Sequence, residues 1–155
     1  MRPEKHRAFS LVEAILAVLF IGIFVAIAVP RLNFAIISKN KAETTAKKIV
    51  TDLRRTRRMA ISDAATNTKG FKLRMVNPSP HGTYEIVNLD TGETVDAHTI
   101  DSDVTVTSPT GQDFKFGPLG ALTTGSGTQV AITAEGKTFT ITVVPATGMI
   151  KCTEN

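Results

Sequence analysis

One carboxylate, that of Glu13, lies near the start of an otherwise apolar stretch that runs from Phe9 to Val29. Placing a carboxylate in hydrocarbon costs on the order of 2.5–3.5 kcal/mol, even on forgiving scales of helix insertion. A residue with that cost is rarely kept for anchoring alone. We therefore expect Glu13 to have a positively charged partner.

Four arginines within five positions form a second charged group: Arg54, Arg55, Arg57 and Arg58. Guanidinium groups at this density could bind the phosphates of DNA, and such binding would weaken steeply with salt. The chain has no tryptophan and one tyrosine, so side chains on which bases could stack are scarce. The alternative is a basic face that meets acidic protein surfaces or lipid headgroups.

The remaining polar residues form no catalytic group. The three histidines have no partner at a spacing typical of a metal or nucleophilic site, and we expect them to be exposed: His6, His81 and His98. Three aspartates lack the ligand spacing of a calcium loop, which favours a solvated acidic loop: Asp96, Asp101 and Asp103. We therefore expect no enzymatic activity, no cofactor and no metal site.

The elements that position these residues follow from the periodicity. Residues 9–30 predict a transmembrane or assembly helix, and residues 31–62 an amphipathic helix. The apolar stripe of the second helix repeats every three or four residues: Ala42, Ala46, Ile49, Leu53, Thr56 and Ala60. Pro30 interrupts the helical pattern and Gly22 weakens it, so the segment between them is the expected place of a bend.

From Phe71 onward the period changes to two, which predicts strands separated by turns. The clearest alternating runs begin at Phe71, Tyr84, Val130 and Phe139. Residues 63–155 should therefore form a small antiparallel β-sheet head. With the amphipathic stripe covering one face of that sheet, the fold class is α+β.

Charge is segregated along the 155 residues, although the formal net charge is only +4. Residues 31–58 contain nine basic and two acidic side chains, whereas residues 59–155 contain six basic and ten acidic ones. One face or end of the molecule should therefore be basic and the other mildly acidic. The one cysteine, Cys152, excludes an internal disulfide.

The string Ala8-Phe9-Ser10-Leu11-Val12-Glu13, behind a short basic leader, resembles the processing site of type IV pilins and type II secretion pseudopilins. The resemblance implies that a prepilin peptidase removes residues 1–8 by cutting between Ala8 and Phe9. The new amine of Phe9 would then be methylated. A neighbouring helix, displaced along the axis, would present its own Glu13 to this amine and so set the register of polymerisation.

Further strings extend the resemblance over nearly the whole chain. Gly22 and Pro30 stand at offsets similar to those of type IV pilins, where this segment loosens during assembly. The strings 53–61, 114–120 and 147–150 resemble the GspH/FimT group of minor pseudopilins and pilins.

The resemblance implies a structural minor subunit of a type II secretion pseudopilus or a type IV pilus. Its partners would be other pilins, the prepilin peptidase and an inner-membrane assembly platform. Phe9 to Val29 would cross the bacterial inner membrane once, over about 32 Å, with the head in the periplasm. A DNA-binding minor pilin is the alternative function, and a cleavable signal ending near Ala26-Ile27-Ala28 is the alternative explanation of the apolar stretch.

Overall fold

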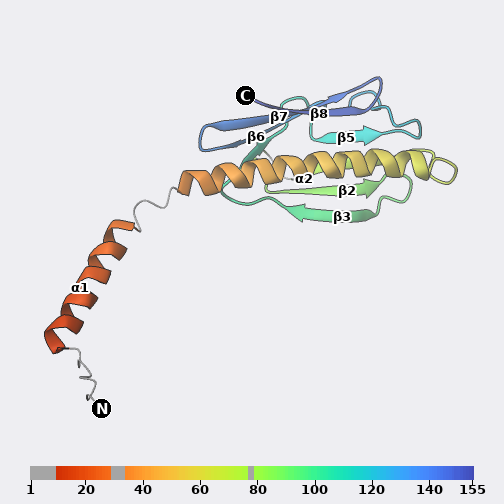
Figure 1. Ribbon diagram of the computed structural model, residues 1–155. Coiled ribbons are helices and arrows are strands. Elements are labelled where there is room, and N and C mark those ends of the chain that lie inside the picture. The colour runs from red at the N-terminus through yellow and green to blue at the C-terminus, as the bar shows by residue number, and fades with distance from the viewer. Residues whose placement is uncertain (1–9, 29–33, 77–78) are drawn as a thin grey trace, which may run out of the picture. The chain divides into compact units, whose positions relative to one another are not determined.

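The structure, a computed structural model, describes residues 10–28, 34–76 and 79–155. The described chain contains two helices and two antiparallel sheets, which confirms the α+β class (Figure 1). It divides into two compact units, residues 1–34 and 35–155, and each is described by itself.

The first unit contains helix α1, Leu11–Ala28. The carbonyl oxygen of Ser10 accepts hydrogen bonds from the amides of Glu13 and Ala14, at 3.0 and 3.2 Å, and so starts the first turn. The helix continues without interruption through Gly22.

The structure contradicts the expected membrane span. The single-pass inner-membrane location with a periplasmic head depended on that span and is contradicted with it. Among residues 10–28, 34–76 and 79–155, no helix is both long and apolar enough to cross a membrane. The 18 residues of α1 are about 27 Å long, less than the roughly 30 Å of a bilayer core. Phe9 and Val29, which the expected span also included, lie outside the described residues.

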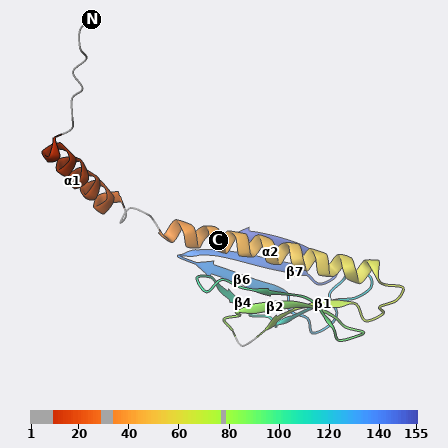
Figure 2. The same cartoon turned by 90° about the horizontal axis from the view of Figure 1, so that it is seen from below.

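The second unit contains all but the first residue of helix α2, Phe34–Ser62, and the apolar stripe of this helix is buried as predicted. Ala42, Ala46, Ile49, Leu53 and Ala60 are at most 1% exposed. Small residues on this stripe let the helix backbone approach the sheets closely. Figure 2 shows α2 lying along one side of strands from both sheets.

The head contains two four-stranded antiparallel sheets rather than the single small sheet that was expected. The first has the order β3-β2-β1-β5: Thr94–Thr99, Thr83–Asn88, Phe71–Val76 and Asp113–Phe116. The second has the order β4-β6-β7-β8: Thr105–Thr107, Gln129–Ala134, Lys137–Val144 and Met149–Glu154. Both sheets and α2 contribute to one apolar core, with Phe114, Leu73 and Ile141 fully buried.

Tight turns set the register within the sheets. The β6–β7 hairpin pairs Ala134 with Lys137, and its two turn residues, Glu135 and Gly136, have φ of 46° and 78°. Positive φ at both central residues gives the turn a twist that matches that of the flanking strands. The expectation that a turn separates the runs beginning at Val130 and Phe139 is therefore confirmed.

Candidate functional site

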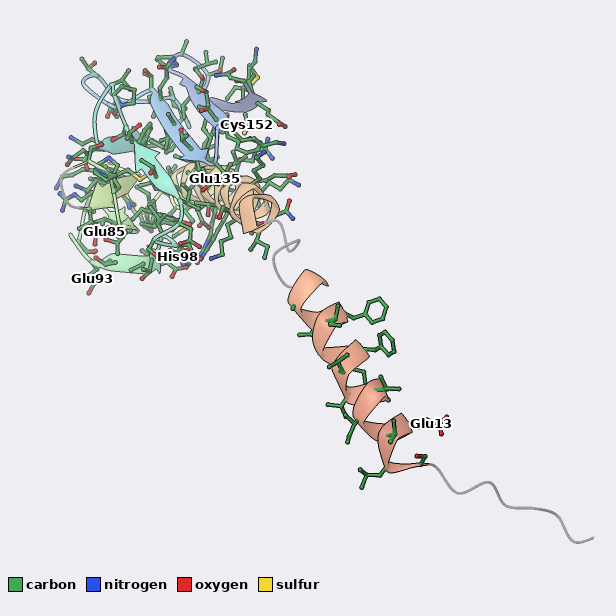
Figure 3. All side chains as sticks on the ribbon, turned by 90° about the vertical axis from the view of Figure 1, so that its left-hand side faces the viewer. Glu13, Glu85, Glu93, His98, Glu135 and Cys152 are labelled. Atoms are coloured by element: carbon green, nitrogen blue, oxygen red, sulfur yellow. The ribbon has the colours of Figure 1, made fainter. Side chains whose placement is uncertain are left out.

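Helix α1 exposes apolar side chains on all sides. Every side chain described in this unit, residues 10–26, is exposed, including Leu11 at 76% and Phe24 at 70%. Figure 3 shows Glu13 on the first turn, with apolar side chains on the turns that follow. Within the described part of the chain, no side chain forms an ion pair or hydrogen bond with the Glu13 carboxylate.

The other residues expected to act in processing and assembly are placed only in part. Ala8, Phe9 and Pro30 lie outside the described residues. Gly22 lies within α1, and a Cβ added there would meet no atom within 4 Å.

The four arginines of α2 do not act as one group. Arg55 reaches strand β3, where its Nη1 lies 2.6 Å from Oδ2 of Asp96. Arg57 turns toward the loop before β6, and its Nε donates a hydrogen bond to the carbonyl oxygen of Gly120 at 3.0 Å. The sequence could not separate these roles, because the partners are 41 and 63 positions away.

Arg54, Arg57 and Arg58 line one hollow of about 570 Å³ at the C-terminal end of α2. The other lining residues are Ile61, two residues of the turn between β7 and β8 (Thr147 and Gly148) and the first two residues of β8 (Met149 and Ile150). We call this site the arginine hollow. None of its three guanidinium groups forms an ion pair within residues 34–76 and 79–155.

Other cations of the head are neutralised by acidic side chains. Lys41 lies 3.1 Å from Asp101 and 2.6 Å from Asp103, so these two aspartates hold α2 to the loop after β3. Part of the segregated charge seen in the sequence therefore forms ion pairs within the molecule, between the basic helix α2 and the acidic head. Asp101 and Asp103 remain exposed, as expected of a solvated acidic loop, and both in addition form an ion pair with Lys41.

A polar network between α2 and the first sheet was missed by sequence reasoning. The hydroxyl of buried Tyr84 donates to Oδ2 of Asp52 at 2.6 Å. Nε2 of His98 lies 3.5 Å from both Asp52 and Asp96, and its ring centroid is 5.2 Å from that of Tyr84. Burial, followed by the bond to Asp52, raises the pKa of Tyr84 far above its usual value. The network therefore keeps the phenol neutral and fixes α2 on β2 and β3.

Two histidines are not exposed as expected. His98 is held in this network with 21% of its side chain exposed. His81 is 2% exposed, and its Nε2 lies 2.6 Å from Oγ of Ser108. His98 lies in β3, whose polar composition resembles that of a surface segment, and His81 lies in the connection between β1 and β2.

The Arg55–Asp96 pair predicts a specific acid sensitivity. Arg55 donates to Asp96 and holds the pKa of that carboxyl below its usual value. A lowered pKa in the folded state stabilises the fold above about pH 4, and this contribution is lost as pH falls through the folded pKa. We expect Arg55→Gln to flatten the fall in melting temperature between about pH 5 and pH 2. Lys48→Gln, which removes a charge from the same helix without breaking an ion pair, is the control. If the melting temperatures of Arg55→Gln and wild type fell equally with pH, the proposed stabilisation by the Arg55–Asp96 pair would be contradicted.

No group of three or more histidine, cysteine, aspartate or glutamate side chains within the described ranges could hold a metal ion. The arrangement offers two binding surfaces, the apolar helix α1 and the arginine hollow. The chain matches no family model, no curated protein and no solved structure, so its resemblance to pilins remains a prediction from the sequence.

Proposed function

We propose that this chain is a structural minor subunit of a filament of the type IV pilus or type II secretion pseudopilus kind, and that it polymerises through α1. The observation that carries the proposal is the exposure of apolar side chains on every side of α1. A helix that is apolar all round is stable when it is buried against other apolar surfaces. The α1 helices of further copies would supply such surfaces.

Glu13 would give this packing its register. A lone carboxylate in an apolar bundle is tolerated only when an opposite charge meets it with good geometry. In the proposed filament that charge is the amine of Phe9 on an adjacent copy, released when a prepilin peptidase cuts after Ala8. Each copy then carries one acid and one amine, which fixes the displacement between neighbours along the axis.

Filaments isolated from cells that produce the chain test this function. We expect the chain to sediment with helical filaments and to be visible on them with a specific antibody. A chain that never enters such filaments, in cells whose filaments are otherwise intact, would contradict the proposal.

Mass analysis of the mature N-terminus tests the processing step. We expect the protein to begin at a methylated Phe9, because assembly through Glu13 needs a free chain end at that position. A mature start near Val29 would instead indicate a cleaved secretory signal. Filaments built from chains that retain residues 1–8 would contradict the proposed role of the Phe9 amine.

A further inference from the structure

The arginine hollow combines unneutralised positive charge with exposed apolar side chains. Ile61 and Met149 line it and are 43% and 47% exposed. Leu119, which is 92% exposed, adjoins Gly120, whose carbonyl oxygen binds Arg57. Arginine and methionine are enriched in protein–protein interfaces, where apolar contacts surround a few charged anchors.

This composition favours a protein occupant over a single-stranded nucleic acid. Single strands bind by stacking their bases on exposed aromatic side chains. In the described residues from Ile37 onward, the exposed large apolar side chains are all aliphatic or methionine: Ile37, Ile61, Val95, Leu119 and Met149. The hollow therefore suits a protein segment that presents a carboxylate.

A carboxylate of this kind is displayed by the same chain on the β6–β7 hairpin. Glu135 is exposed, and no ion pair involves it within the described head. Its φ of 46° is a left-handed conformation that this turn would more readily give to asparagine, aspartate or glycine. Residues held in this conformation cluster at functional sites, which makes Glu135 a candidate contact residue.

The hairpin tip and the arginine hollow lie toward opposite ends of α2. Lys137, next to the tip, interacts electrostatically with Glu43 near the start of α2. The hollow is lined by residues 54–61, near the end of that helix. Figures 1 and 2 both show the β6–β7 turn at the end of the head where α2 begins.

We propose that the arginine hollow of one copy binds the β6–β7 hairpin tip of the next, with the Glu135 carboxylate between Arg54 and Arg58. This inference rests on the proposed function and names the contact between heads. Each copy has one hollow and one tip, so the contact is heterologous and can extend into an open filament. A symmetric contact of hollow with hollow would instead bring arginines together.

Charge exchange in the full chain tests this contact. We expect Arg58→Glu and Glu135→Arg each to reduce the sedimenting, assembled fraction at least 10-fold, because each places like charges opposite one another. The double variant, in which the charges are exchanged, should recover to within about 3-fold of wild type. Both positions are exposed, and circular dichroism before assembly would confirm that the variants fold. Lys48→Glu, an equal charge change on α2 outside the hollow, is the control and should assemble normally.

The outcomes separate this contact from the proposed function. Normal assembly of both single variants, while Glu13→Ala fails to assemble, would overturn the head contact and leave polymerisation through α1 standing. Glu135 would be excluded as the occupant if Arg58→Glu reduced the assembled fraction but Glu135→Arg did not. It would also be excluded if the double variant failed to recover assembly. A gel shift of a DNA duplex that Arg58→Glu abolishes, with assembly unchanged, would assign the hollow to nucleic acid and also overturn the proposal.

Discussion

Gly70→Ala is expected to lower the free energy of unfolding of the head by about 3 kcal/mol or more. Gly70 has φ of 82°, and a left-handed conformation costs a residue with a Cβ roughly 1–2 kcal/mol. The new Cβ would also overlap the carbonyl oxygen of Phe116, a backbone atom that cannot rotate away. Relief would require β1 and β5 to move apart where Phe71 pairs with Phe116.

The measurement is thermal or urea unfolding of the full chain, with Gly82→Ala as the matched control. A Cβ at Gly82 would meet no atom within 4 Å, and its φ is not positive. We expect the melting temperature of the control to be close to that of wild type. For Gly70→Ala, a loss of about 3 kcal/mol in the free energy of unfolding corresponds to a fall in melting temperature on the order of 10 °C. A Gly70→Ala protein as stable as the control would contradict the observed approach of β1 to β5.

Much of the head could be predicted because its strongest patterns are local. The stripe on α2 has helical period, and the runs at Phe71, Tyr84, Val130 and Phe139 alternate cleanly, so all of these are found where expected. Strands β3, β4 and β8 are short or mostly exposed, and their polar residues give no such alternation. The division into two sheets depends on long-range pairing, which a local pattern does not specify.

The candidate sites were harder to predict because they depend on distant partners. The four arginines form one cluster in the sequence, but Asp96 and Gly120 divide them among three roles in space. Asp52 stands within a basic helix, and only the position of Tyr84 shows that this carboxylate is a buried acceptor. A weak signal for that role was present, since Asp52 lies three residues after Ile49 and four before Thr56, and both of these are buried.

The second large effect is expected from Glu13→Ala. In a bundle of α1 helices this change would leave the amine of an adjacent chain buried without its partner. Breaking a buried ion pair in this way costs about 3–5 kcal/mol, which corresponds to a loss of assembly on the order of 100-fold or more. Glu43→Ala is the matched control, because that acid lies on the surface of α2 and forms an exposed ion pair with Lys47 four residues later.

Polymerisation through α1 is tested most directly by the ratio of variant to wild-type chains in filaments from cells that produce both. We predict that Glu13→Ala chains are present in the cells at normal levels but nearly absent from the filaments, while Glu43→Ala chains enter in proportion to their abundance. Equal incorporation of the Glu13→Ala chain would contradict the account, because the apolar helix would then assemble without its only acid.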